Sequence, residues 1–130
     1  MDEIDLQILR MLKENARIKY VEISRALGLT EGAVRRRIKR LKESGIIKRF
    51  TVETSIEIEG IVLIETETDK TEDVVKKVRG ICDKVFEVSG EYDIAALIQA
   101  YTIDELNKRI DEIRRLSGVL ATKTLIKLKN

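Results

Sequence analysis

Six basic residues fall within eight positions of one short segment, residues 35–42, which reads RRRIKRLK. They are Arg35, Arg36, Arg37, Lys39, Arg40 and Lys42. Like charges on one helix repel each other, so this arrangement lowers helix stability unless an anion is close. Guanidinium and ammonium groups bind phosphate oxygens, and a row of them predicts a polyanion as partner. A charged helix face that is only solvated is the alternative interpretation.

The helical phase of this segment separates an apolar side from a cationic side. At about 100° per residue, three residues share one side and are predicted to be buried: Val34, Ile38 and Leu41. Arg36 and Arg40 point nearly opposite to that side, and Gly32 points outward with them. Arg37 lies beside the apolar side, where we expect it to pair with a neighbouring residue or a phosphate.

Few acidic residues are spaced to neutralise the cationic side. Glu31 and Arg35 form the one acid–base pair at i, i+4 spacing that we identify on this helix. The predominance of arginine over lysine also favours nucleic acid over bulk solvent as the partner.

The elements that position this helix follow from apolar spacing and helix-end residues. The pattern over residues 4–12 predicts a first helix, and residues 21–27 a second one that stops at Gly28. Thr30 is a suitable N-cap for a third helix over about 31–44. Two helices joined by a short turn with glycine form a helix-turn-helix, whose second helix enters the major groove of DNA.

This arrangement assigns expected roles to individual residues. Contacts to base edges or the nearest phosphates are expected from the start of the third helix: Thr30, Glu31, Gly32, Arg35 and Arg36. Phosphate positioning is expected from five further residues: Lys39, Arg40, Arg17, Ser24 and the amide of Val21. The sequence therefore predicts double-stranded DNA as a partner.

The charge of the chain divides near its middle. Residues 1–50 contain 13 Lys and Arg against 7 Asp and Glu, and residues 51–130 contain 12 against 16. A basic half joined to an acidic half predicts a polyanion-binding module and a second module that avoids the polyanion. We predict a DNA-binding domain over 1–50, a linker strand over 51–60, where the apolar period changes to two, and a second domain over 61–130.

The second domain has a recognisable order of elements. Strands are expected over 61–68, 84–89, 92–100 and 119–129, and helices over 71–81 and 103–116. This βαββαβ order predicts a ferredoxin-like fold and makes the whole chain α+β. The apolar strands over 92–98 and 119–128 predict that a second copy of the chain covers the sheet face left open by the helices.

The composition argues against several functions. The chain has no histidine and a single cysteine, Cys82, which we expect to be a buried small apolar residue. Ser–His and Cys–His catalysis and ordinary zinc sites are thereby excluded, and we expect no metal, no cofactor and no enzyme. No apolar run approaches the roughly 20 residues that span a bilayer, and the start, MDEIDLQIL, is acidic. We therefore expect a cytoplasmic protein without a membrane partner.

Several motifs, in order along the chain, resemble those of a known family. They are DEIDLQIL at 2–9, NAR at 15–17, VEIS at 21–24, LGLT followed by VRRRIKRL at 27–41, SGIIKRFT at 44–51, SGEYDIAALI at 89–98 and SGVLATKTLI at 117–126. Together they resemble the Lrp/AsnC family of transcriptional regulators, also called feast/famine or leucine-responsive regulatory proteins. The resemblance covers essentially the whole chain.

This resemblance implies a sequence-specific regulator with an N-terminal winged helix-turn-helix, a linker strand and a ferredoxin-like effector domain. It implies homodimers that assemble further to tetramers or octamers and bind a small amino acid between dimers. The effector loop of the family corresponds to Ser89, Gly90, Glu91, Tyr92 and Asp93. The rest of the pocket corresponds to Ile103, Thr122, Thr124 and Leu125.

The loop chemistry agrees in part with an amino-acid ligand. A carboxylate suits an ammonium group, and amides or hydroxyls suit a carboxylate, so Asp93 is the natural ammonium partner. The alternative is that Gly90 is only a turn and Asp93 an exposed strand end. The chain also has Thr30-Glu31-Gly32 where the family often has Ser-Pro-Thr. An architectural protein that compacts DNA without an effector is the alternative function, and an amino-acid-handling enzyme is a more distant one.

Overall fold

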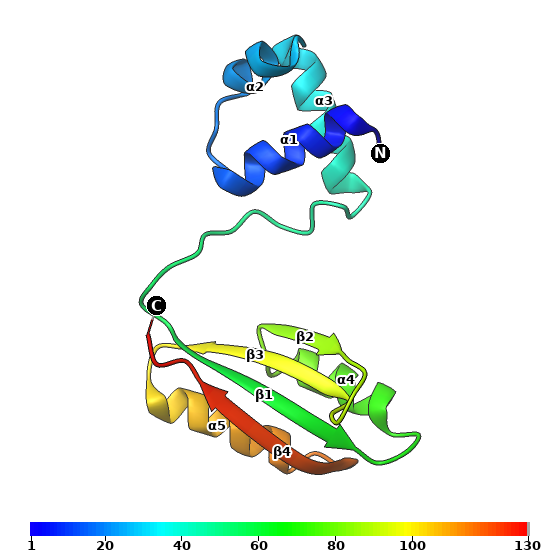
Figure 1. The fold of residues 1–130 in the computed structure, drawn as a ribbon, viewed down its shortest axis with the longest axis vertical. Helices are drawn as coiled ribbons and strands as arrows, with labels where there is room; N and C mark the ends of the chain where they lie inside the picture. Colours follow the sequence, from blue (N-terminus) through cyan, green and yellow to red (C-terminus); the bar gives the residue numbers. More distant parts are fainter. Residues whose placement is uncertain (130) are drawn as a thin grey trace. The chain divides into compact units, whose positions relative to one another are not determined.

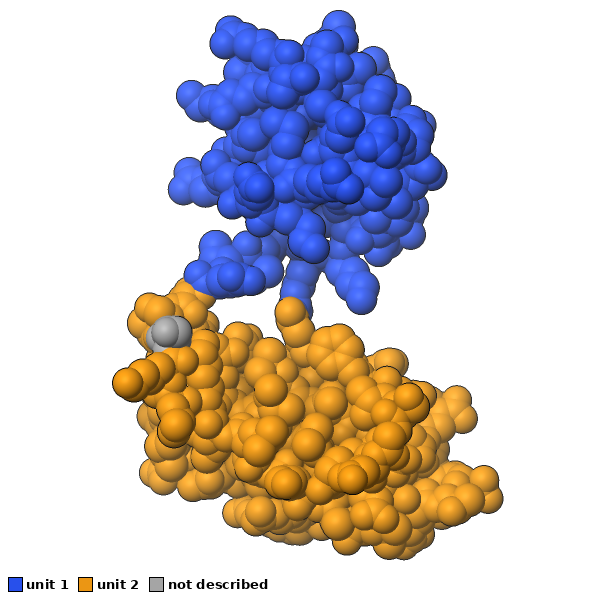
Figure 2. Space-filling model, viewed as in Figure 1, with its two compact units in different colours: residues 1–53 blue, residues 54–130 orange. Residues whose placement is uncertain are grey.

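The computed structural model describes residues 1–129 and consists of two compact units, Met1–Glu53 and Thr54–Asn130 (Figure 2). The last residue of the predicted second domain, Asn130, lies outside the described residues.

The N-terminal unit contains three helices: α1 (Glu3–Glu14), α2 (Tyr20–Leu27) and α3 (Glu31–Glu43) (Figure 1). Asp2 caps α1 by accepting from the Asp5 backbone N–H at 2.9 Å, and the Asp5 carboxylate accepts from the Asp2 N–H at 3.3 Å. Thr30 caps α3 by accepting from the Ala33 N–H at 3.1 Å. The predicted helix-turn-helix is therefore present.

The turn between α2 and α3 depends on Gly28. Its φ of 68° lies in the left-handed region, which a residue with a Cβ adopts at a cost. The Gly28 N–H donates to the Ser24 carbonyl and ends α2. The Leu29 N–H donates to the same carbonyl at 2.9 Å, and Leu29 packs against the core.

The predicted helical phase of α3 is confirmed. Val34 is 0% exposed, Ile38 4% and Leu41 3%. Val34 and Ile38 pack with Ile8 of α1 and Ile23 of α2 in one core. Because this apolar side is fixed against two other helices, the opposite side of α3 must face solvent.

The segment after α3 differs from the prediction. The Ile47 N–H donates to the Leu41 carbonyl at 2.9 Å and Ile47 packs on the core, while Lys42 Nζ lies 5.1 Å from the centre of the Phe50 ring. Residues 44–57 contain no strand, so the predicted linker strand over 51–60 is wrong except for its last three residues. An extended segment becomes a strand only when its N–H and C=O groups pair with another strand, and the registers of the described sheet do not include residues 51–57.

The second unit has the predicted βαββαβ order. Its elements are β1 (Ile58–Thr66), α4 (Thr71–Arg79), β2 (Lys84–Glu87), β3 (Ile94–Ala100), α5 (Ile103–Arg114) and β4 (Val119–Ile126). The strands form one sheet in the order β2-β3-β1-β4 with every neighbouring pair antiparallel, and α4 and α5 cover one face (Figure 1). The ferredoxin-like expectation is confirmed.

The sheet buries one face and exposes the other. Val62, Ile64 and Ile98 are 0% exposed and pack with α4 and α5. Neighbouring positions point to the other face, where Ile61 and Leu125 are register partners and are 45% and 49% exposed. The predicted second copy on this face stays a prediction.

A group of hydrogen bonds around Arg109 and a close approach at Gly118 stabilise the edges of this unit. Arg109 of α5 donates to Asp83 at 2.9 Å and to Glu105 at 2.8 Å, and Asp83 also accepts from the Gln99 backbone N–H at 2.7 Å. A Cβ on Gly118, whose φ is 95°, would meet Lys70 Cβ at 2.9 Å. The turn before β4 therefore requires glycine to lie against the start of α4.

Among residues 1–129, no helix combines the length and apolarity needed to cross a membrane.

Candidate nucleic-acid interface and effector loop

The outer face of α3 is cationic and unpaired at its centre. Arg36 and Arg40 are exposed, and neither side chain has an ion pair or hydrogen bond with the described residues. Together with Lys39 and Glu43 they line an open hollow on this face. Among the described residues, the acidic partner on this face is Glu43, whose Oε1 lies 3.9 Å from Lys39 Nζ. Both side chains are more than half exposed, so solvent screens this pair.

The identification of Glu31 and Arg35 as the one i, i+4 pair on this helix is wrong. Arg35 makes no ion pair with Glu31; its guanidinium lies 5.6 Å from the centre of the Tyr20 ring, on the first residue of α2. An i, i+4 ion pair does form on α3 between Lys39 and Glu43, a pair that the sequence analysis did not identify. An aromatic face attracts a guanidinium at this distance, and Tyr20 is fixed by packing on the core, whereas Glu31 is exposed.

Arg37 was expected to pair with a neighbouring residue or a phosphate, and the structure shows the pairing with neighbouring residues. Its Nη1 donates to Asp2 Oδ1 and Oδ2 at 2.9 and 2.8 Å and to Asp5 Oδ1 at 3.1 Å. The hydrogen bond from Arg37, followed by that from the Asp5 backbone, lowers the pKa of Asp2, and the same carboxylates raise the pKa of Arg37. Arg37 thus joins α3 to the start of α1 and is turned away from the exposed face.

The five predicted phosphate positioners fall in different surroundings. Lys39, Arg40 and Arg17 are exposed. The amide of Val21, in the first turn of α2, has no acceptor among the described residues and suits an anion. Ser24 is only 7% exposed, and its hydroxyl donates to the Val21 carbonyl at 2.8 Å. The structure therefore places Ser24 within the helix packing and away from the exposed face.

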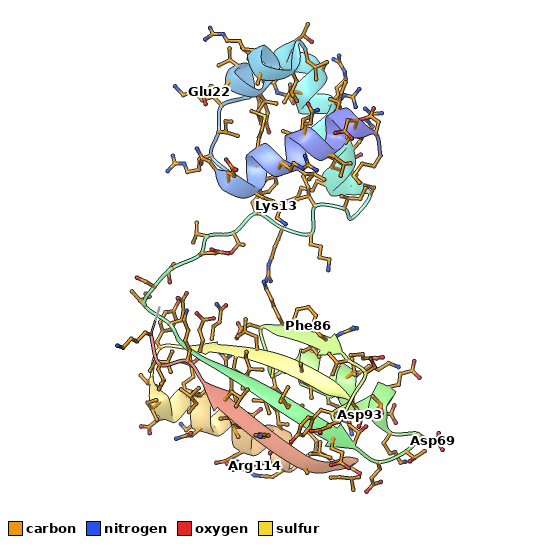
Figure 3. The ribbon with its side chains drawn as sticks, viewed as in Figure 1. Lys13, Glu22, Asp69, Phe86, Asp93 and Arg114 are labelled. Atoms are coloured by element: carbon orange, nitrogen blue, oxygen red, sulfur yellow. The ribbon has the colours of Figure 1, made fainter. Side chains whose placement is uncertain are left out.

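The predicted effector loop lies where β2 passes into β3 (Figure 3). Ser89, Gly90 and Glu91 are exposed, and Tyr92 and Asp93 are half-buried. Asp93 Oδ2 accepts from the Thr66 backbone N–H at 2.8 Å and from its hydroxyl at 3.2 Å. The Asp93 N–H donates to the Ile64 carbonyl at 2.9 Å. Asp93 is therefore a bonded part of the sheet end, and the alternative of an exposed strand end is wrong.

The remaining predicted pocket residues are not brought together with this loop in one chain. Thr122 and Thr124 pair with Ile64 and Val62 and share their helix-covered face, whereas Leu125 pairs with Ile61 and points to the open face. Thr122 accepts from Arg114 Nε at 3.3 Å, and the buried hydroxyl of Thr124 has no hydrogen-bond partner among residues 1–129.

Ile103 lies at the other end of the sheet. It is half exposed at the start of α5, and the seven residues of β3 separate it from Asp93, a span of roughly 20 Å. A pocket that uses every predicted residue would therefore need more than one chain.

Two observations concern the thiol and the acidic side chains of the described residues. Cys82 is half-buried, and its pKa is raised to about 12, first by burial and then by the charge of Asp83, so the thiolate is disfavoured. No group of three His, Cys, Asp or Glu side chains within residues 1–129 is placed to hold a metal ion.

The fold and the cationic helix define a class of protein: a helix-turn-helix DNA-binding unit joined to a ferredoxin-like unit. Comparison with protein families agrees with this class. Residues 1–48 match the model for winged helix-turn-helix DNA-binding domains, and residues 59–130 match the Lrp/AsnC ligand binding domain. The chain belongs to the Lrp/AsnC family of transcriptional regulators, which are not enzymes.

Curated relatives support this assignment over the full length. The transcriptional regulator LysM of Sulfurisphaera tokodaii is 40% identical, with 99% of this chain and 96% of the relative covered. The regulator FL11 of Pyrococcus furiosus is 35% identical, with 99% and 90% covered.

Solved structures show the same fold. PH0061 superimposes with a TM-score of 0.86 at 25% identity, covering 100% of this chain and 97% of that one. NMB0573 of Neisseria meningitidis, solved as a complex with L-Met, superimposes with a TM-score of 0.77 at 24% identity, covering 99% and 90%.

Proposed function

We propose that this regulator recognises a specific DNA sequence through α3. The observation that supports this most is that the side chains of Arg36 and Arg40 are exposed, and have no partner within residues 1–129, on the outer face of the second helix of a helix-turn-helix. Thr30, Glu31, Gly32, Arg35 and Arg36 form the set proposed to meet base edges or the nearest phosphates. Arg17, Lys39, Arg40 and the Val21 amide are proposed to position the helix on phosphates, and Ser24 is left out because it is buried.

The proposal requires two copies of the chain. Paired recognition helices enter successive major grooves one helical turn apart, so a two-fold symmetric dimer reads a pseudo-palindromic site. Ile61, Phe86 and Leu125 support this, because they are about half exposed and belong to strands of the sheet whose other face the helices cover. Burial of these side chains against a second copy would remove apolar surface from water. Assembly of dimers to tetramers or octamers belongs to the same proposal.

A small amino acid is the proposed effector. The loop Ser89, Gly90, Glu91, Tyr92 and Asp93 offers carboxylates for an ammonium group and exposed backbone for a carboxylate. Asp93 Oδ2 is occupied by Thr66, so Oδ1 is the oxygen left for the ligand. Ile103, Thr122, Thr124 and Leu125 complete the proposed pocket from more than one chain. The effector can shift the assembly or the domain orientation only to the extent that it binds one of the two arrangements more tightly than the other.

Selection of DNA from a random pool tests this function. The protein is incubated with the pool in parallel reactions, one without effector and one with each amino acid, and bound DNA is sequenced. Enrichment of a pseudo-palindromic site, altered by one amino acid, is expected. Equal recovery of all sequences would contradict specific recognition and favour an architectural protein that compacts DNA.

A further inference from the structure

Gly32 lies in the first turn of α3, where the backbone conformation does not require glycine. Its φ is not in the left-handed region, and glycine lowers helix stability relative to alanine. A Cβ built on Gly32 would lie 3.3 Å from Nη1 of Arg36, closer than ordinary van der Waals contact; apart from the two adjacent residues and the backbone of α3, no other described atom lies within 4 Å of it. The space above Gly32 is therefore taken by the guanidinium of Arg36.

The direction of Arg36 explains this contact. Side chains on an α-helix slope toward its N-terminus, so residue i+4 covers the surface above residue i. The guanidinium of Arg36 thus lies along the first turn of α3, although its Cα lies one turn later. The first turn of a recognition helix is the part that faces base edges in the major groove.

The two neighbouring arginines are held by other groups. Arg35 lies over the Tyr20 ring, and Arg37 is bonded to Asp2 and Asp5. The side chain of Arg36 has no ion pair or hydrogen bond within residues 1–129. Of the three consecutive arginines, Arg36 is the one whose guanidinium lies over a residue without a side chain, and its donors have no acceptor within residues 1–129.

We propose that Gly32 determines DNA specificity through Arg36: its missing side chain lets the guanidinium lie on the first turn and donate two N–H groups to the O6 and N7 atoms of a guanine. This geometry is the commonest specific contact between arginine and a base. A Cβ at position 32 requires the guanidinium to move outward by a few tenths of an ångström, and we expect this shift to weaken the bidentate alignment while the positive charge stays near the phosphates. The inference rests on the proposed function, because it presupposes a selected DNA site.

Two single variants and their combination test the coupling. Gly32→Ala, Arg36→Ala and the double variant are measured in the full-length protein against the selected site and against versions with each guanine replaced by adenine. Gly32→Ala is expected to melt at the same or a higher temperature than wild type, because alanine favours the helix and the displaced guanidinium is free to move. It is expected to lose guanine discrimination by on the order of tenfold at one position of the half-site. The double variant is expected to discriminate no less than Arg36→Ala alone.

The control is Gly80→Ala. Gly80 ends α4 with a φ of −81°, and a Cβ there meets only the Lys77 carbonyl at 3.5 Å, so the same chemical change is made far along the chain from α3. This variant is expected to discriminate like wild type.

Three results would overturn the inference in different ways. Unchanged discrimination by Gly32→Ala would show that position 32 does not determine specificity. An equal loss from Gly32→Ala in the presence and absence of Arg36 would show that the residue acts through backbone approach and independently of Arg36. A wild-type protein that selects no site would contradict the proposed function itself, before any variant is compared.

Discussion

Nη1 of Arg37 donates to both carboxylate oxygens of Asp2, at 2.9 and 2.8 Å, across 35 positions of sequence. This contact joins the middle of the recognition helix to the N-cap of α1. The neighbouring arginines therefore differ in role. Arg37 joins α3 to α1, while the side chain of Arg36 remains unpaired within residues 1–129.

Replacing Arg37 with methionine is expected to lower the melting temperature and to leave the affinity for DNA nearly unchanged. Methionine keeps the apolar stem and removes the hydrogen bonds. Because Arg37 lowers the folded-state pKa of Asp2, its stabilisation is present above the unfolded pKa of about 4 and is lost as the pH falls through the lower folded value.

Thermal melts at pH 7 and near pH 2 check this. The difference in melting temperature between wild type and Arg37→Met is expected at pH 7 and is expected to shrink at the acidic end. A fall in DNA affinity without a change in melting temperature would place Arg37 on the DNA-binding face.

Reversing Arg36 and Arg40 together to glutamate is expected to abolish DNA binding, with a loss of at least about 100-fold, while the fold and the assembly state are kept. Both side chains are exposed and have no partner within residues 1–129, so nothing in the core depends on them. Reversal of Lys76 and Lys77, exposed on α4, makes the same change of charge in the other unit and serves as the control. Affinity is measured by fluorescence anisotropy and assembly by sedimentation.

The same titrations measure the salt dependence. If three cationic side chains per subunit neutralise phosphates in a dimer, affinity should fall by about 10³ between 50 and 200 mM salt. The Lys39→Ala variant should reduce the slope of log affinity against log salt by about 1 for each phosphate that the Lys39 ammonium group neutralises. A flat salt profile for the wild type would rule out phosphate binding by this face.

Tyr20 is expected to position Arg35. Tyr20→Leu removes the ring and should weaken DNA binding several-fold, because Arg35 is then no longer restrained by a cation–π interaction of about 0.5–1 kcal/mol. Tyr20→Phe keeps the aromatic face and should bind DNA like wild type. Anisotropy titrations compare the two, with melting curves to account for the packing of Tyr20 on the core. Equal affinity for the leucine and phenylalanine variants would exclude this role.

Asp93 is expected to have two separable roles. Asp93→Ala leaves the buried Thr66 N–H without its acceptor and should cost about 1–3 kcal/mol of stability, as well as the response to an amino acid. Asp93→Asn keeps an acceptor oxygen for Thr66 but removes the negative charge. It should therefore fold nearly as well as wild type and still lose the response, measured as the effector-dependent change in DNA affinity. A full response from the asparagine variant would place the ammonium partner elsewhere.

The sequence alone determined the helices, the strands of the second unit and the phase of α3. Local signals were enough here: apolar residues at helical spacing, Thr30 as an N-cap, Gly28 as a stop, and alternation along the strands. The burial of Val34, Ile38 and Leu41 followed from the spacing because a helix has one fixed period. The order βαββαβ then restricted the second unit to few topologies.

Tertiary structure decided which partner each polar group takes. The sequence favoured Glu31 for Arg35 and an exposed site for Ser24; packing placed Arg35 over Tyr20 and buried Ser24. The contact of Arg37 with Asp2 and that of Asp93 with Thr66 join residues 35 and 27 positions apart. The spacing of apolar residues in the sequence does not predict such pairs, because they form only when separate helices and strands pack together. Likewise, residues 51–57 have strand-like alternation but no strand, because pairing needs a second backbone.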